Sequence, residues 1–255
     1  MPGFGLAWAI SLAASAGAPV RAASLDLCSD EYLLGVGRDA EIVSLSRLSS
    51  DPGDGRWWRR AQRFAANDGS VEGVIAARPN LVVTMGGGGR ARADIARRIG
   101  IKVVDLPYPA SPGEVAANLR TVAAALGEAR RADRWVARIA ALTPPARPRD
   151  AIFLQGGGLS LGPRSLGAQW MARAGLAQRL LPGGRATIEG LRLHPPAVLL
   201  LSDYRSAQVS AGRTWLDHPL LRAMPGRRIM TDGRGWTCGG PGLVGEIERL
   251  RAVLP

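Results

Sequence analysis

The chain is poor in the side chains that carry most catalytic and metal-binding chemistry. Its 255 residues include two cysteines, Cys28 and Cys238, and two histidines, His194 and His218. It contains no Walker phosphate loop and no paired-histidine metal helix. Each histidine precedes a proline, which favours a turn, and the cysteines and histidines are too scattered for a zinc site. We therefore expect no catalytic residue and no bound metal centre, and we do not expect an enzyme.

Lysine is almost absent as well. Lys102 is the only lysine, so the formal charge of +12 comes almost wholly from arginine. The arginines are spread along the chain, whereas a nucleic-acid surface usually gathers basic residues and interleaves them with aromatics. We expect no nucleic-acid partner, and the charge modestly favours anionic ligands.

The first residues have the composition of a secretory signal. Residues 4–18 are apolar and small, and Val20-Arg21-Ala22 offers small residues where a signal peptidase reads. We expect residues 1–22 to be a signal peptide cleaved after Ala22, although only the amino terminus supplies positive charge before the apolar run. The run is too short to span a bilayer. Lipid attachment at Cys28 is disfavoured because Leu27, and not a small residue, precedes it.

Export to an oxidising compartment would permit the two cysteines to form a disulfide. Cys28 and Cys238 are an even pair and would close a loop of about 210 residues. On the chain-entropy model such a bond stabilises by up to about 5 kcal/mol. The sequence does not decide between a Cys28–Cys238 disulfide and two free thiols.

A phrase in the first half of the chain recurs in the second. Glu72-Gly73-Val74 is followed after four residues by the apolar run 79–83, and Glu189-Gly190-Leu191 after four residues by the apolar run 196–200. Each copy predicts a short helix, a proline that ends it and a strand buried on both faces, as in parallel sheets. The repeat indicates two lobes of the same build, with chance similarity between apolar strands as the alternative.

A helical stretch separates the two copies. Ser111-Pro112 is a helix start signal, and apolar residues recur at helical spacing up to residue 142, interrupted at Gly127. We expect two helices end to end, the second acting as a strut between the lobes.

Apolar runs and helix signals predict the remaining elements. We expect strands over residues 23–27, 42–45, 81–85, 101–106, 151–154, 198–201 and 228–231, and helices over residues 29–34, 92–99, 169–180, 215–224 and 241–253.

Glycines and aromatic residues follow the predicted strands, where parallel sheets place ligands. Residues 86–89 and 156–158 are glycine loops, and Trp57 and Trp58 follow a polar loop. Adjacent tryptophans cannot both face one core, so at least one contacts solvent or a ligand. Backbone amides at the start of the terminal helix are suited to an anionic group.

One pattern supports a different function. Gly86, Gly88 and Ala91 fit the G-x-G-x-x-A dinucleotide fingerprint between a strand and a helix, and Asp105 ends the next strand. The alternative is therefore an exported dinucleotide-binding oxidoreductase that uses residues 86–89. Soluble NAD is not expected outside the cytoplasm, and the fingerprint lies late in the first half, so we rank this alternative second.

Four segments, residues 27–31, 72–83, 100–103 and 236–241, occur in an order that resembles the substrate-binding proteins of ABC importers for iron chelates, haem and vitamin B12. The resemblance covers residues 23–255. It implies an α/β fold of two Rossmann-like lobes joined by a long backbone helix, with a ligand cleft between them and limited hinge motion. The lobes would be residues 23–110 and 146–255, and the connector residues 111–145.

The resemblance also implies a role and partners. The chain would be a periplasmic monomer without a cofactor, which carries a corrinoid such as vitamin B12 or a ferric siderophore to a permease and its ATPase. Glu72 and Glu189 would dock onto arginines of the permease. Haem is less favoured, because no histidine is well placed as an axial ligand. The expected ligand-binding residues are Cys28, Ser29, Trp57, Trp58, Met85, Gly86, Gly87, Tyr108, Gly157, Tyr204, Trp236 and Cys238.

Overall fold

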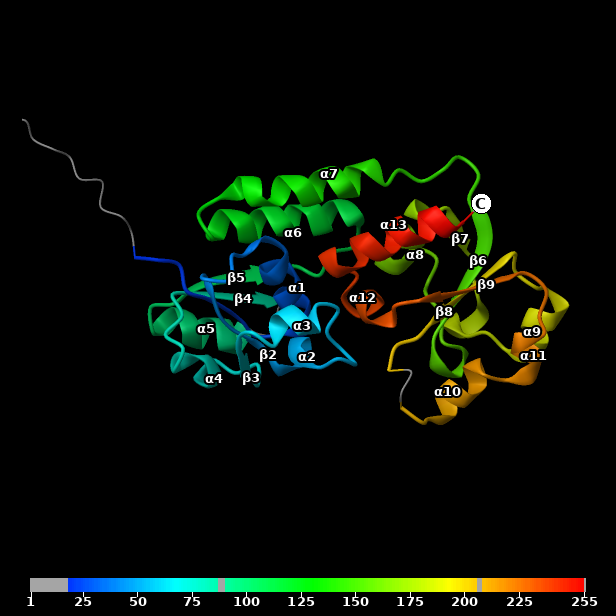
Figure 1. The fold of residues 1–255 in the computed structure, drawn as a ribbon, viewed down its shortest axis with the longest axis horizontal. Helices are drawn as coiled ribbons and strands as arrows, with labels where there is room; N and C mark the ends of the chain where they lie inside the picture. The colour runs from blue at the N-terminus through cyan, green and yellow to red at the C-terminus, as the bar shows by residue number, and fades with distance from the viewer. Residues whose placement is uncertain (1–17, 87–89, 206–207, 255) are drawn as a thin grey trace, which may run out of the picture.

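The chain folds into two parallel α/β lobes joined by a helical connector (Figure 1). This computed structural model describes residues 18–86, 90–205 and 208–254. The expected signal peptide lies largely outside the described residues. Ala22, the last residue of that expected segment, is buried as the first residue of a strand.

The N-terminal lobe is built on a five-stranded sheet of order β3-β2-β1-β4-β5. Its elements are β1 (Ala22–Ser24), α1 (Leu27–Val36), β2 (Ile42–Ser46), α2 (Arg47–Ser50), α3 (Trp58–Ala61), β3 (Ala65–Asn67), α4 (Glu72–Ile75), β4 (Leu81–Met85), α5 (Arg90–Arg98) and β5 (Lys102–Leu106).

The C-terminal lobe is built on a four-stranded sheet of order β7-β6-β8-β9. Its elements are β6 (Arg149–Leu154), η2 (Gly156–Gly158), α8 (Leu166–Arg173), β7 (Leu176–Gln178), η3 (Pro182–Gly184), α9 (Ile188–Leu193), β8 (Val198–Ser202), α10 (Ala211–Leu216), α11 (Pro219–Arg222), β9 (Arg227–Thr231), α12 (Gly233–Cys238), η4 (Pro241–Leu243) and α13 (Val244–Val253).

The two sheets share one topology. All their strand pairs are parallel, and β1, β2, β4 and β5 occupy the places that β6, β7, β8 and β9 occupy in the second sheet. The repeated phrase falls on equivalent elements, because α4 precedes β4 and α9 precedes β8. The two copies therefore belong to the same structural unit in the two lobes.

One hydrophobic core runs through both lobes. Alternate residues of β4 face opposite sides, so that Val83 joins the main core and Val82 joins a smaller cluster beneath α4 and α5. The main core continues through Trp135 of the connector to Phe153 and Trp170 of the second lobe. Since side chains of both lobes pack into this one cluster, rotation of one lobe against the other would disturb core packing.

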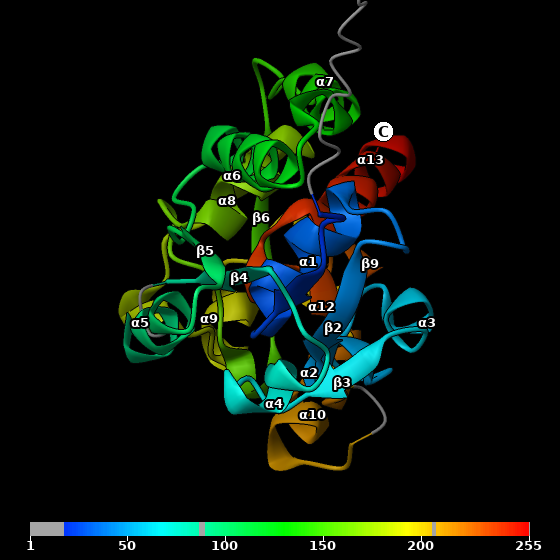
Figure 2. The same ribbon diagram turned by 90° about the vertical axis from the view of Figure 1, so that its left-hand side faces the viewer.

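The connector was predicted with the correct elements but the wrong arrangement. It consists of α6 (Pro112–Ala125), η1 (Ala129–Ala132) and α7 (Asp133–Ala141), and the Ser111 hydroxyl caps α6 by accepting from the amide of Glu114. The helices do not run end to end, because α7 folds back beside α6 along one side of the molecule (Figures 1 and 2). Gly127 adopts φ +88° at the reversal, a conformation that glycine takes at little cost.

Several local boundaries also differ from the predictions. The first helix begins at Leu27 and β1 ends at Ser24. Residues 233–238, for which no element was predicted, form α12. The predicted helix over 169–180 is α8 followed by β7, and β3 was not predicted. Both missed strands have three residues, too few to show a period of two. Within the described residues no helix is long and apolar enough to cross a membrane.

Candidate functional site

The segments that follow the strands of the two lobes face and contact each other. In the first lobe this segment is residues 51–56, after β2 and α2. In the second lobe it is residues 203–205, after β8, together with residues 232–234, after β9. Side-chain hydrogen bonds join them at two places, through Asp54 and through Arg56. The carboxyl ends of both sheets therefore point into one interlobe junction, which is where parallel sheets hold ligands.

The first link is made by Asp54, whose residue is only 3% exposed. Its carboxylate accepts from the Tyr204 hydroxyl at 2.7 Å and from Nε and Nη2 of Arg205 at 2.9 and 2.7 Å. The hydrogen bond from Arg205 is the main reason that the pKa of Asp54 lies below its usual value. Burial and the bond to Asp54 raise the pKa of Tyr204. Asp54 is therefore an anion and Tyr204 a neutral hydroxyl donor at neutral pH.

In the second link the first lobe provides the arginine and the second lobe provides the carboxylate. Arg56 of the first lobe donates from Nη1 to the carboxylate of Asp232 in the second. Arg234 binds the same carboxylate through Nε and Nη2, both at 2.8 Å, and donates to the Pro52 carbonyl at 3.1 Å. Burial works to raise the pKa of Asp232, but the two guanidinium groups outweigh it and hold that pKa below the usual value. The Arg56 Nε is buried without an acceptor in the part of the chain described.

Gly55 allows its two neighbours, Asp54 and Arg56, to reach the second lobe. A Cβ built on Gly55 would lie 2.0 Å from the carbonyl oxygen of Ser49, which no side chain tolerates. Only glycine allows the segment to pass this close to α2, so that Asp54 and Arg56 on either side of it both reach the second lobe.

A disulfide and a buried carboxyl join the lobes beside this junction. Cys28 at the start of α1 is bonded to Cys238 at the end of α12, with the Cα atoms 5.2 Å apart. The bond that the sequence left open is therefore present, and neither sulfur is available as a ligand. Glu31, one turn along α1, accepts from the amide of Gly242 at 3.2 Å, and burial raises its pKa to about 8. The amide predicted to receive an external anion thus receives an internal carboxyl.

Three further residues predicted to bind ligand are enclosed within the lobes. The Ser29 hydroxyl bonds to that of Ser24 at 2.6 Å, Met85 is 5% exposed, and Trp236 packs on Phe153 with ring centroids 4.8 Å apart. The indole of Trp236 also donates to the Thr231 hydroxyl at 2.8 Å. Strand and helix packing covers these three side chains, and their role as ligand contacts stays a prediction.

Other predicted residues do lie at the strand ends. Gly86, with φ +85°, follows β4 and is covered by the ring of Tyr108, which is 67% exposed. Gly157 follows β6 and lines a cavity of about 560 Å³ together with Trp215. Tyr204 lies in the junction. Gly87 and the rest of the glycine loop that suggested a dinucleotide site, residues 87–89, lie outside the described residues.

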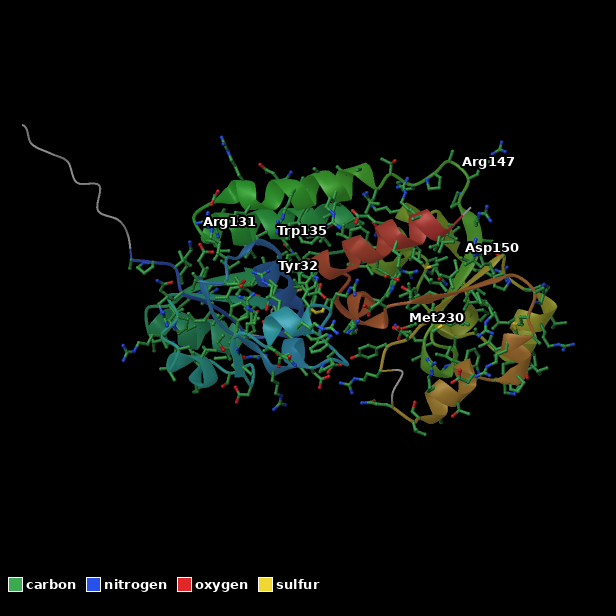
Figure 3. The ribbon with its side chains drawn as sticks, viewed as in Figure 1. Tyr32, Arg131, Trp135, Arg147, Asp150 and Met230 are labelled. Atoms are coloured by element: carbon green, nitrogen blue, oxygen red, sulfur yellow. A yellow bond between two sulfur atoms is a disulfide. The ribbon has the colours of Figure 1, made fainter. Side chains whose placement is uncertain are left out.

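Trp57 and Trp58 line a different cavity. This cavity, of about 410 Å³, lies on the flank of the first lobe between α1, α3 and α7. The Trp57 ring packs on Trp135 of α7 at 5.8 Å, and Arg59 stacks over Trp58 at 4.5 Å. The Trp135 indole donates to the Gly35 carbonyl at 2.8 Å, which ties the connector to α1 (Figure 3). The two tryptophans are thus partly accessible, as expected, but they face the connector.

The two glutamates of the repeat have matching surroundings. Glu72 begins α4 and Glu189 lies in the first turn of α9, and both are exposed. Two residues before each glutamate a hydroxyl accepts from the glycine amide that follows the glutamate: Ser70 from Gly73 at 2.9 Å, and Thr187, the N-cap of α9, from Gly190 at 3.0 Å. The repeated phrase is therefore longer than the sequence prediction assumed.

The charged residues of the junction were not predicted as site residues. Asp54, Arg56, Arg205 and Asp232 each follow a strand or its short helix, which was a usable signal. Their pairing was not readable, because partners are separated by 151 and 176 residues. Among the residues that the structure describes, no group of three or more His, Cys, Asp or Glu is placed to hold a metal ion.

Several solved structures with this fold are described as periplasmic haem-binding proteins. RhuT, the periplasmic haem-binding protein from Roseiflexus sp. RS-1, matches with a TM-score of 0.69 and 21% identity, over 92% of this chain and 97% of that chain. The periplasmic haem-binding protein HutB of Vibrio cholerae matches with a TM-score of 0.72 and 16% identity, over 92% and 98% of the two chains. A periplasmic haem-binding protein from Pseudomonas aeruginosa matches with a TM-score of 0.66 and 22% identity, over 92% of each chain. At these identities the likeness establishes the fold.

Sequence comparison identifies a family for part of the chain. No curated protein matches the chain. The sequence profile of a family described as periplasmic binding protein matches residues 23–149, which include nearly all of the first lobe and the connector. Together with the two-lobed fold and the facing strand ends, this match identifies the chain as a member of the periplasmic binding protein family.

Proposed function

We propose that the chain is the solute-binding component of an ABC importer, which holds a metal chelate between its lobes and delivers it to the membrane permease. The observation that carries the proposal is the interlobe junction, where segments from the carboxyl ends of both sheets meet through Asp54, Tyr204 and Arg205. A ligand between these segments would contact both lobes at once, which is how a two-lobed protein encloses its cargo.

The cargo class follows from the chemistry around the junction. The junction itself offers the ring of Tyr204 and the guanidinium groups of Arg56 and Arg205, and the ends of other strands offer the rings of Tyr108, beside Gly86, and Trp215, beside Gly157. Aromatic faces suit a corrin or porphyrin ring, and guanidinium groups suit the acidic groups of a chelate. Several proteins of the same fold are described as haem-binding, which adds haem to the corrinoids and ferric siderophores expected from sequence.

Binding without chemical change is part of the proposal. The periplasmic binding protein family consists of transport proteins, and nothing in its match supports the dinucleotide oxidoreductase considered as the alternative. The decisive test is a titration of the purified chain with haem, cyanocobalamin, cobinamide and several ferric siderophores, followed by absorbance and thermal unfolding. One chelate should bind stoichiometrically and be recovered unaltered. Thermal stabilisation by NAD or FAD, with no binding of any chelate, would favour the dinucleotide-binding oxidoreductase over the solute-binding protein.

We assign docking onto the membrane permease to two exposed glutamates, Glu72 and Glu189. Glu72 and Glu189 occupy equivalent places in the repeated unit, one on each lobe, which supports a partner that meets both. Exposed charges of this kind set partner choice and association rate. The variant Glu72→Lys with Glu189→Lys should abolish uptake by proteoliposomes that carry the permease, while chelate affinity stays within twofold.

The matched control for docking is Glu128→Lys. Glu128 is an exposed carboxylate on the turn between α6 and α7, at the opposite side of the molecule from α4 (Figure 1). This variant should leave uptake unchanged. If the double variant instead loses chelate affinity, the glutamates support the site and not the docking surface.

A further inference from the structure

The cavity between α1, α3 and α7, here called the flank cavity, has the size of a small-molecule site. Its volume of about 410 Å³ lies within the range of about 300–1,000 Å³ that is usual for such sites. Three tryptophans line it, Trp57, Trp58 and Trp135, together with Leu34 and four arginines, and no acidic residue is among the described residues of its wall. All these side chains belong to the first lobe and the connector, and among them only Arg56 also takes part in the interlobe junction.

Two sets of hydrogen bonds hold the walls of the flank cavity in place. The Arg60 guanidinium of α3 donates to the Gly37 carbonyl, directly after α1, at 3.0 Å and to the Asp39 carboxylate at 2.7 Å. The Trp135 indole of α7 donates to the Gly35 carbonyl of α1 at 2.8 Å. Because α3 and α7 are both fixed to α1 in this way, the cavity is formed before any ligand enters, which lowers the cost of binding.

Core packing does not explain the Trp58 side chain. Trp135 belongs to the main core, and Trp57 packs against that core and against the Trp135 ring, with the two ring centroids 5.8 Å apart. Trp58 is half-buried and belongs to none of the hydrophobic clusters that the described residues form. The guanidinium of Arg59 lies 4.5 Å from its ring centroid. A half-buried tryptophan outside the core offers flat apolar surface to a planar ligand.

The charge at the flank cavity is positive and only partly neutralised. Two of its arginines are paired with aspartates. The other two, Arg59 and Arg134, are exposed and form no ion pair with another residue that the structure describes. Arg134 donates to the Gly35 carbonyl at 3.2 Å, which leaves further guanidinium donors for a ligand. Guanidinium groups pair most strongly with carboxylates and similar anions.

We propose that the flank cavity is a binding site for a planar aromatic acid, whose ring lies against Trp58 and whose carboxylate pairs with Arg59 and Arg134. The tryptophans select for a flat ring, and the two arginines select for the acid over its uncharged analogue. This site is separate from the cargo site between the lobes, so its occupation does not require a chelate.

Calorimetric titration of the full chain with 2-naphthoate and with uncharged 2-naphthamide tests this proposal. One 2-naphthoate should bind per chain, and 2-naphthamide should bind about 5- to 30-fold more weakly, the factor expected for loss of two partly exposed ion pairs. Arg59→Gln with Arg134→Gln should lower the affinity for the acid to that for the amide and change the affinity for the amide by less than twofold. Trp58→Leu should weaken both ligands about 3- to 10-fold through loss of ring contact.

The matched control is Arg98→Gln with Arg120→Gln. These exposed arginines of α5 and α6 carry the same two charges but do not line the flank cavity, so affinity for 2-naphthoate should stay within twofold. An equal loss in this control would show a general charge effect and overturn the proposal. Equal affinities for acid and amide, or no binding of 2-naphthoate at millimolar concentration to the folded wild type, would overturn it as well. None of these outcomes concerns chelate binding, so the proposed transport function is judged by its own titration.

Discussion

Removal of the interlobe disulfide should destabilise the fold strongly. The bond joins α1 of the first lobe to α12 of the second across 210 residues of sequence. On the chain-entropy model, closing a loop of this length lowers the entropy of the unfolded chain enough to stabilise the fold by about 5 kcal/mol. Replacing both Cys28 and Cys238 by serine removes this restriction and leaves no unpaired thiol.

The folded state itself should survive the substitution. The Glu31 carboxyl still receives the amide of Gly242, and the main core still packs both lobes and the connector together. The loss should therefore appear in unfolding and not as separated lobes. For a chain of this size about 5 kcal/mol corresponds to a fall in melting temperature of about 10 to 20 °C.

Calorimetry of three samples tests this reasoning. The oxidised wild type should melt highest, while the double serine variant and the wild type with its disulfide reduced should melt together at the lower temperature. The same reductant added to the double serine variant controls for effects unrelated to the bond. If the variant melts within about 2 °C of the oxidised wild type, the bond does not restrict the unfolded chain as argued.

Two smaller changes test the surroundings of the junction. Burial raises the pKa of Glu31 from 4.5 to about 8 and that of Asp30 from 3.8 to about 7. The protonated carboxyls contribute their full stability below the unfolded-state pKa values, and this contribution is lost as pH rises through the folded-state pKa values. The free energy of unfolding should therefore fall as pH rises from 4.5 to 8. Glu31→Gln should remove its share of this fall, up to about 5 kcal/mol, and denaturant titrations at both pH values measure it. A pH profile identical to wild type would contradict the burial argument. Gly55→Ala places a Cβ 2.0 Å from the Ser49 carbonyl and should weaken chelate binding at least 10-fold, whereas Gly113→Ala, whose Cβ would have its nearest neighbour at 3.7 Å, should not; equal affinities would show that the segment has room to move.

The parts of this protein that were predictable from sequence are those that depend on neighbours along the chain. The cap at Ser111, the apolar run of β4 and the repeated glutamate phrase each lie within a few residues, and the structure places a helix start, a buried strand and an equivalent unit where they were expected. The family resemblance, carried by short segments in order, also agreed with the profile match and the fold.

The details of the site required the path of the chain in three dimensions. Whether Cys28 meets Cys238, whether Trp57 faces the junction or the connector, and which arginine pairs with Asp54 depend on contacts between segments far apart in sequence. Local pattern determines helices, strands and their buried faces, because those depend on backbone geometry and hydrophobic period. It does not determine how α7 folds back or how the lobes meet, because these follow from side-chain packing between surfaces that only the folded chain brings together.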